Sequence, residues 1–176
     1  MGAGKSLAII SVEHNYSRIG QKTKVFTAAL DDRFGTGVVA SRIGVSIPAE
    51  AFTSETVFSP ELIGNVNCVL VDESHFLNTR QVKELHKIAA LTKIPVICYG
   101  LRTDFLGNAF EGSAALGVTA DALEELKSVC HCGRRANFNI RIDANGDRVR
   151  SGAQIQIGGD DSYQQACSTC FYQEIK

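Results

Sequence analysis

The first residues of the chain combine glycines with a lysine and a serine in an order that could hold phosphate. Gly2, Ala3, Gly4, Lys5 and Ser6 end the pattern G-x-x-x-x-G-K-[ST]. In such a loop, backbone N–H groups cradle the phosphates, the lysine reaches the β- and γ-phosphates, and the serine hydroxyl ligates Mg²⁺. The apolar run that follows predicts a helix whose N-terminal end attracts the same anion. The first glycine and its strand would precede Met1, so a first core strand is expected to be missing here, and we expect either a longer biological chain or an impaired protein.

Two acids close an apolar run in the middle of the chain. The stretch at 67–72 reads NCVLVD and is typical of a buried parallel strand. Asp72 at its end is placed as the acid that holds Mg²⁺ in nucleoside triphosphatases. Glu73 next to it could take a proton from an attacking hydroxyl or water. A solvated strand end is the plainer reading, but the acids and the loop together favour phosphoryl transfer.

Four of the six cysteines form two close pairs near the C-terminus. Cys130 and Cys132 are separated by one residue, and Cys167 and Cys170 by two. Four thiolates suffice for a closed tetrahedral zinc site, so we predict structural zinc over two disulfides or four free thiols. The other two, Cys68 and Cys98, lie in apolar strands and are expected to pack as small hydrophobes.

The segment between the cysteine pairs could alternatively be a zinc-anchored ribbon that binds nucleic acid. Its basic residues are Arg134, Arg135, Arg141, Arg148 and Arg150. Aspartates alternate with them, at positions such as Asp143 and Asp147. We therefore interpret the segment as a solvated surface of mixed charge.

Composition excludes several classes of protein. The 176 residues are 44% hydrophobic and 21% charged, with a formal net charge of −1. These values fit a globular chain that buries a core, and they argue against binding of nucleic acid through bulk charge. No apolar run approaches the ~20 residues of a membrane helix, and the N-terminus does not read as a signal peptide. We expect no membrane association and a cytoplasmic location.

Hydrophobic patterning predicts the elements that would position these residues. Strands are expected at 24–30, 67–72 and 95–101, and a helix capped by Asn78 separates the last two. A strand, a helix and a strand at this spacing predict a parallel sheet of the α/β class. The segment at 34–60 is expected to be long and irregular, with short elements.

Composition changes near residue 130, where alternation predicts strands around Ile140 and Ile142 and around Ile155 and Ile157. We therefore expect two domains. Residues 1–128 would form a P-loop α/β domain with a mostly parallel sheet, and residues 129–176 a small β-rich domain that binds zinc.

Several stretches together resemble the type II thymidine kinases, and most closely the proteobacterial members. They are residues 1–6 (MGAGKS), 31–34 (DDRF), 71–76 (VDESHF), 99–105 (YGLRTDF) and 157–163 (IGGDDSY) with Cys167. They follow the family's order over almost the whole chain. The resemblance implies a RecA-like core, a zinc-containing lasso that serves as a lid, and a homotetramer. It also implies transfer of the ATP γ-phosphoryl group to the 5′-hydroxyl of thymidine, a salvage step that feeds DNA synthesis.

The resemblance also implies roles for single residues. Glu73 would be the catalytic base, while Ser6, Asp31 and Asp72 would lie at Mg²⁺. The phosphates of ATP would contact Asp72 and the loop Gly2, Ala3, Gly4, Lys5 and Ser6. The residues implied to bind thymidine are Met1, Phe76, Leu101, Phe105, Phe110 and Tyr163, beneath a loop at about 137–163 that is tied at its ends by zinc. Deoxyuridine is the expected near-substrate, and thymidine triphosphate the expected feedback inhibitor.

Two other functions are compatible with parts of the pattern. A RecA-type ATPase would use Glu73 to activate water and would turn over ATP without a nucleoside. A zinc-ribbon module with a vestigial phosphate loop would bind nucleic acid with a steep salt dependence.

Overall fold

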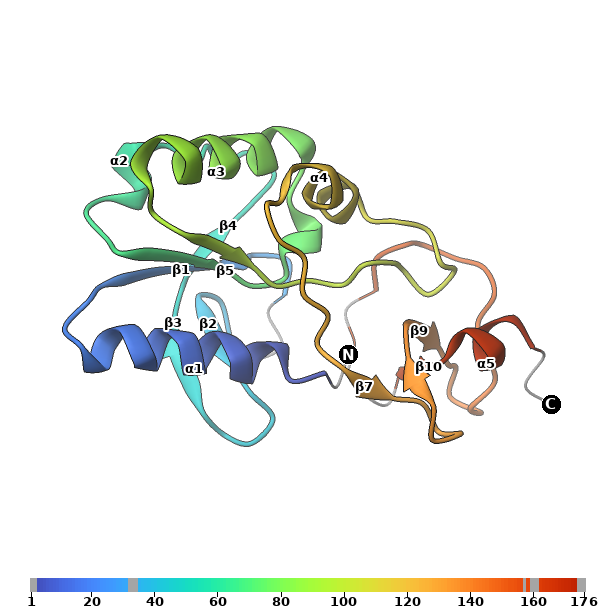
Figure 1. The fold of residues 1–176 in the computed structure, drawn as a ribbon. Helices are drawn as coiled ribbons and strands as arrows, with labels where there is room; N and C mark the ends of the chain where they lie inside the picture. The colour runs from blue at the N-terminus through green and yellow to red at the C-terminus, as the bar shows by residue number, and fades with distance from the viewer. Residues whose placement is uncertain (1–2, 32–34, 157, 159–161, 174–176) are drawn as a thin grey trace.

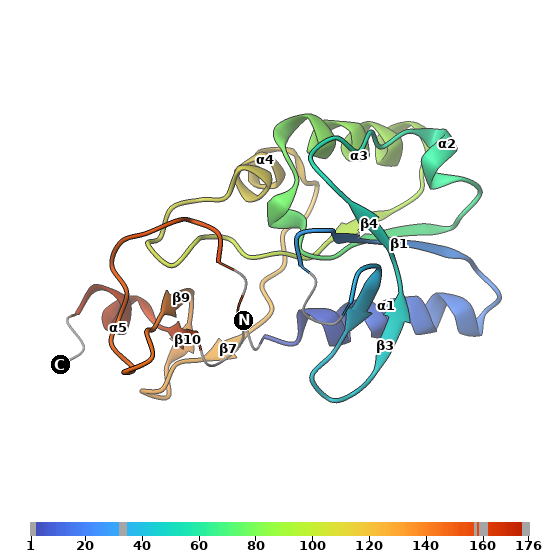
Figure 2. The same cartoon turned by 180° about the vertical axis from the view of Figure 1, so that it is seen from behind.

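The computed structural model describes residues 3–31, 35–156, 158 and 162–173. These residues form a layered α/β part and a smaller part built from short strands, which lie side by side (Figures 1 and 2). The chain passes from the first to the second through the segment after α4 (Glu111–Thr119). Within the described residues, no helix has the length and apolar character needed to cross a membrane.

The centre of the larger part is a four-stranded sheet in which every neighbouring pair is parallel. Its spatial order is β4 (Glu50–Phe52), β1 (Thr23–Ala28), β5 (Cys68–Val71) and β6 (Val96–Cys98). All four residues of β5 are buried, because helices cover both faces of a parallel sheet. This confirms the predicted α/β class.

Two apolar clusters hold helices against the two faces of the sheet. On one face α1 (Lys5–Arg18) packs through Ile9 and Ile10 against Leu70. On the other, α3 (Thr79–Thr92) and α4 join Phe26 and Val71 in the larger cluster. Figure 1 shows this layering, with α1 on one side of the sheet and α2 (Pro60–Ile63), α3 and α4 on the other.

The start of α3 follows from its sequence. The Asn78 side chain accepts a hydrogen bond from the backbone N–H of Gln81, and the Gln81 side chain accepts one from the N–H of Asn78. This reciprocal pair satisfies two donors that a helix start leaves open. The predicted cap at Asn78 is therefore confirmed.

The segment predicted to be irregular contains two short strands before β4. β2 (Val38–Ala40) and β3 (Ser46–Pro48) pair antiparallel beside α1. Figure 2 shows them on the same side of the sheet as that helix. The expectation of short elements is confirmed here.

The smaller part consists of two short antiparallel pairs and one helical turn. β7 (Ser128–Val129) pairs with β8 (Arg135–Ala136), β9 (Phe138–Arg141) pairs with β10 (Tyr163–Ala166), and α5 (Ser168–Tyr172) follows.

The strand predicted around Ile155 is wrong. Ile155 lies in no strand, while Ile157 lies outside the described residues. The carbonyls of Ala153 and Gln154 accept hydrogen bonds from the side chain of Arg141 instead of pairing in a ladder. Ile142 forms only an isolated bridge with Arg148.

Candidate active site

The lysine and serine of the predicted phosphate loop stand at the first turn of α1. Gly4 precedes the helix with φ of 76°, in the left-handed region that glycine adopts without steric cost. Lys5 is the first helical residue and Ser6 follows it. Ala3 is described, whereas Met1 and Gly2 lie outside the described residues. The loop therefore meets the positive end of the helix, as an anion site requires.

The predicted acids stand where β5 ends. The N–H of Asp72 still donates to Phe26 in the neighbouring strand, and the N–H of Glu73 donates to the Asp72 carboxylate at 2.9 Å. Glu73 then turns the chain with φ of 48°, a left-handed conformation that costs a non-glycine residue of order 1–3 kcal/mol. The turn leads into a short 3-10 helix, η1 (Ser74–Phe76). Residues held in such conformations cluster at active sites, so the strain makes this turn a candidate functional site.

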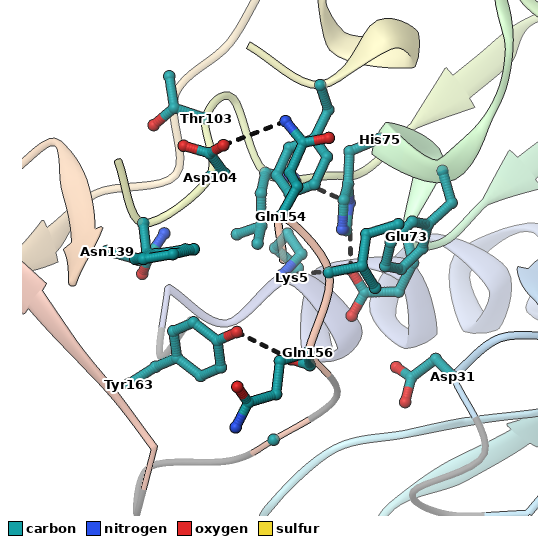
Figure 3. Close-up of a pocket in the computed structure, with 16 residues that line it drawn as sticks. Lys5, Asp31, Glu73, His75, Thr103, Asp104, Asn139, Gln154, Gln156 and Tyr163 are labelled. Carbon is teal, nitrogen blue, oxygen red and sulfur yellow. Dashed lines mark hydrogen bonds and ion pairs between the residues drawn. The ribbon is translucent and has the colours of Figure 1, made fainter. Parts of the chain in front are cut away.

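The charges of the loop and of the acids interact directly. Lys5 Nζ lies 3.9 Å from Glu73 Oε2 (Figure 3). Burial, followed by the adjacent charge of Glu73, raises the pKa of Asp72 to about 7. The ammonium of Lys5 acts in the opposite direction and lowers it. A cation bound next to Asp72 would therefore relieve a strongly unfavourable buried charge.

A small cavity of about 270 Å³ lies beside these acids. Its polar lining comes from α1, from β1 and from the residues that follow β1 and β5. These residues are Ser6, Thr27, Asp31, Asp72 and Glu73. Hydroxyl and carboxylate oxygens are the donors that Mg²⁺ prefers. The structure thus brings together Ser6, Asp31 and Asp72, which are far apart in the sequence.

A larger cavity of about 570 Å³, part of it open to solvent, adjoins the first. It is lined by five residues that the sequence singled out for the nucleoside: Phe76, Leu101, Phe105, Phe110 and Tyr163. Its aromatic walls are those of a pocket for a small, flat ligand. Met1, the sixth of that set, lies outside the described residues.

Other polar residues of this cavity had no role assigned from the sequence. They are His75, Thr103, Asp104, Asn139, Gln154 and Gln156 (Figure 3). His75 was the most accessible to prediction, because it stands two residues after Glu73. Its Nδ1 lies 3.5 Å from Glu73 Oε2 and accepts a hydrogen bond from the N–H of Leu101, and its ring packs on Phe76 and Phe110.

Two residues line both cavities, namely Asp31 and Glu73. One cavity has the donors for phosphate and a hard cation, and the other has apolar walls. Glu73 therefore stands where a group bound in one cavity would meet a group bound in the other. A base or an orienting carboxylate for phosphoryl transfer needs this position.

The four predicted zinc ligands converge although their spacing differs between the two pairs. The sulfur atoms of Cys130, Cys132, Cys167 and Cys170 all lie within 4.8 Å of one another. The Cys132 and Cys167 sulfurs are 3.6 Å apart, close to the ~3.8 Å edge of a tetrahedron with Zn–S bonds near 2.3 Å. A hydrogen bond from the backbone N–H of Cys170 lowers the pKa of Cys167 to about 6, which favours the thiolate. The donor set fits a structural zinc ion.

The interpretation of the arginines as one solvated surface is wrong for Arg141. Arg134, Arg135 and Arg150 are exposed, as expected, but Arg141 is only 4% exposed. Its guanidinium lies 3.8 Å from the centre of the Phe105 ring, which shields it from water. Arg148 is half-buried over Phe171. Alternation of arginine and aspartate could not reveal these long-range contacts.

A parallel sheet that sets a Gly-Lys-Ser helix start against an Asp-Glu strand end defines a P-loop protein of nucleotide phosphate chemistry. The model of the family described as "Thymidine kinase" matches residues 1–171. A thymidine kinase of Haemophilus influenzae (strain ATCC 51907 / DSM 11121 / KW20 / Rd) is 51% identical over 172 residues, which cover 95% of this chain and 89% of that protein. A thymidine kinase of Pasteurella multocida is 48% identical, over 99% of this chain and 94% of that protein. The chain belongs to the thymidine kinase family.

Proposed function

We propose that this protein transfers the γ-phosphoryl group of ATP to the 5′-hydroxyl of thymidine and so forms thymidine monophosphate. The observation that carries this proposal is the meeting of two cavities at Asp31 and Glu73. One suits phosphates with a hard cation, and the other suits a flat base and its sugar. Membership of the family supplies the identity of the two substrates.

The phosphates of ATP would lie over the start of α1. Backbone N–H groups of Gly2, Ala3 and Gly4 would contact them, together with the Lys5 ammonium. Lys5 now lies near Glu73, with its side chain 15% exposed, and ATP would offer it a stronger anionic partner. The ammonium would then hold the γ-phosphoryl group beside the carboxylate.

Mg²⁺ would bind in the smaller cavity to Ser6 and Asp72, with Asp31 beside it. The raised pKa of Asp72 supports this site, because burial of that carboxylate is favourable only when a cation compensates it. Bound there, Mg²⁺ would neutralise charge on the β- and γ-phosphates during transfer.

Glu73 would orient the 5′-hydroxyl and accept its proton. Its left-handed backbone turns the carboxylate toward both cavities, and its side chain is only 11% exposed. Such a base contributes about 10²–10⁴-fold to rate. Phe76, Phe105, Phe110 and Leu101 would hold the base, with Tyr163 from the lid, and Met1 belongs to the same proposed set. Exclusion of water would limit wasteful hydrolysis of ATP.

The cysteine cluster would hold a structural Zn²⁺ that fixes the second domain, which we place at 129–176 beside a first domain at 1–128. The β7–β8 pair begins at Ser128, and the cysteines lie next to β7, β8 and β10, which supports that boundary. A closed set of four thiolates leaves no open coordination position, so its role would be to anchor the roots of the lid.

Further properties expected of this protein are proposals that the family suggests. They are phosphorylation of deoxyuridine, feedback inhibition by thymidine triphosphate and assembly as a homotetramer. All six cysteines are free, and this supports a reducing, cytoplasmic location.

The test measures thymidine monophosphate made from ATP and thymidine by the purified protein and by Glu73→Gln. The isosteric amide cannot accept the proton, so kcat should fall by about 10²–10⁴-fold while the KM for ATP changes little. Hydrolysis of ATP without transfer to thymidine would favour an ATPase instead. Salt-sensitive binding of nucleic acid without either activity would favour a zinc-ribbon module.

A further inference from the structure

Arg141 occupies an unusual position for a cationic side chain. It ends β9 and stands directly opposite Tyr163 of β10, so the two side chains lie on the same face of this strand pair. It is 4% exposed, although arginine is almost never fully buried without a partner. None of the described carboxylates forms an ion pair with it; its partners are carbonyls, a phenol hydroxyl and aromatic rings.

In the part of the chain that the structure describes, the side chain of Arg141 donates hydrogen bonds only within the lid, to the segment at 153–154 and to Tyr163 of β10. Its Nη1 donates to the Ala153 carbonyl at 3.0 Å and its Nη2 to the Gln154 carbonyl at 3.4 Å. Its Nε and Nη2 donate to the Tyr163 hydroxyl at 3.1 and 3.0 Å. That hydroxyl donates in turn to the Gln156 carbonyl at 2.8 Å. One guanidinium thus joins the segment at 153–156 to β9 and β10.

The same side chain connects the lid to the larger domain. The carbon of its guanidinium lies 3.8 Å from the ring centre of Phe105, a wall of the nucleoside cavity that is 2% exposed. Beside this contact, Gln154 Nε2 donates to Asp104 Oδ2 at 3.1 Å (Figure 3). Two N–H groups, of Leu106 and Asn108, fix the other oxygen of Asp104. The lid therefore docks on a rigid loop of the core.

We propose that Arg141 is a positioning residue that holds the lid closed over the nucleoside and so sets the KM for thymidine; this inference rests on the proposed function. Among the described residues, the carbonyls of Ala153 and Gln154 accept hydrogen bonds only from Arg141, and that of Gln156 only from Tyr163. Without the Arg141 hydrogen bonds, the segment that carries Gln154 would not be held against Asp104, so the contacts of the lid with Asp104 and Phe105 would be lost together. Closure is therefore cooperative, and it shapes the Tyr163 and Gln156 side of the cavity.

Lysine is the informative replacement, because it keeps the charge but lacks both the fork and the plane of guanidinium. Arg141→Lys should raise the KM for thymidine by about tenfold or more and should leave the KM for ATP within about twofold. Loss of closure should also raise the hydrolysis of ATP relative to transfer. Amide exchange at residues 150–156 should become faster in the protein without ligands.

Arg148→Lys is a matched control from the same domain. Arg148 also lies over an aromatic ring, 4.4 Å from the centre of Phe171, and it donates to the carbonyl of that residue. It does not line either cavity. This variant should lower the melting temperature while the KM for thymidine and the exchange at residues 150–156 stay as in the unaltered protein.

Tyr163→Phe is a second test of the role of Arg141, because it removes only the hydroxyl to which Arg141 donates. The effects of Arg141→Lys and Tyr163→Phe on the KM for thymidine should be clearly less than additive in the double variant. Additive effects would overturn the proposal that Arg141 holds the lid closed. So would an Arg141→Lys protein that loses stability without a change in this KM or in amide exchange. An unaltered protein that makes no thymidine monophosphate would refute the proposed function, whereas the exchange experiment would still test the role of Arg141.

Discussion

Two neighbouring carboxylates at the end of β5 have different environments, which fit the different roles proposed for them. Asp72 is 5% exposed and faces the smaller cavity, and its Oδ1 accepts a hydrogen bond from the N–H of Glu73. Glu73 faces both cavities and lies near the cation of Lys5. Burial raises the pKa of Asp72 despite the nearby ammonium of Lys5, so a bound cation would stabilise its charged form. In the proposed reaction, Glu73 is the carboxylate that would reach the hydroxyl.

This difference predicts how Asp72 affects stability with pH. The folded protein raises the pKa of Asp72 from 3.8 to about 7, so its stabilising effect is complete below about pH 4 and is lost as the pH rises through 7. Over that range the free energy of unfolding should fall by up to about 1.4 kcal/mol per pH unit from this group. Asp72→Asn stays neutral, so without Mg²⁺ it should exceed the unaltered protein in stability at pH 8 and lose that advantage near pH 4.

Urea unfolding at both pH values, with a chelator present, measures this effect. Added Mg²⁺ should stabilise the unaltered protein at pH 8 but not Asp72→Asn, because the ion binds the charged carboxylate. An advantage of Asp72→Asn that is the same at pH 4 and pH 8 would contradict the proposed titration.

At the scale of elements, the position of the turn at Glu73 depends on a close approach between α4 and η1. A Cβ at Gly112 in α4 would lie 2.6 Å from the carbonyl oxygens of Ser74 and Leu77 and 3.0 Å from that of His75. These are backbone atoms, so they cannot yield by rotation of a side chain. Glycine at 112 therefore allows the helix to support the turn that carries Glu73.

Gly112→Ala should destabilise the protein by ~1–3 kcal/mol and lower kcat, because the extra methyl group must push η1 away from its place. Gly117→Ala in the same helix is the control, since its Cβ would meet no atom within 4 Å. Alanine favours a helix interior by ~0.5–1 kcal/mol, so this variant should be more stable and equally active. Thermal unfolding and initial rates distinguish the two; equal effects would show that the contact does not support the site.

The elements that sequence could predict are those whose signal is local. The buried strand β5 and the helix cap at Asn78 can each be predicted from a few consecutive residues. The strand expected around Ile155 fails because an alternating pattern needs a partner strand, and a side chain of Arg141 takes the carbonyls there instead. Pairing between distant segments cannot be read from periodicity alone.

At the scale of the molecule, the candidate site is assembled from both parts of the chain. Lys5, Asp31 and Glu73 come from the sheet and α1, whereas Asn139 and Tyr163 come from β9 and β10. Sequence motifs predicted the phosphate-binding residues because these lie in loops at the ends of strands. They did not predict the contacts of Asp104, Gln154 or Arg141, which arise from docking of the lid on the core.

The cysteine cluster stands at the root of that lid, which leads to a prediction for the whole molecule. β9 begins six residues after Cys132, and β10 ends directly before Cys167, so one metal ion would fix both strands that carry the lid. Cys170→Ser should lower bound zinc from one ion per chain to well below one. It should also raise the KM for thymidine more than the KM for ATP, because α1 and β5 have their own core.

Cys98→Ser is the control for loss of a thiol, since Cys98 lies in β6 and burial raises its pKa to about 12, which keeps it neutral. That variant should keep its zinc. Atomic absorption on both proteins, followed by rates at varied thymidine and varied ATP, makes the comparison. Removal of zinc by a chelator should reproduce the kinetics of Cys170→Ser. If Cys170→Ser lost its zinc and both KM values rose equally, the metal would support the whole fold and not the lid in particular.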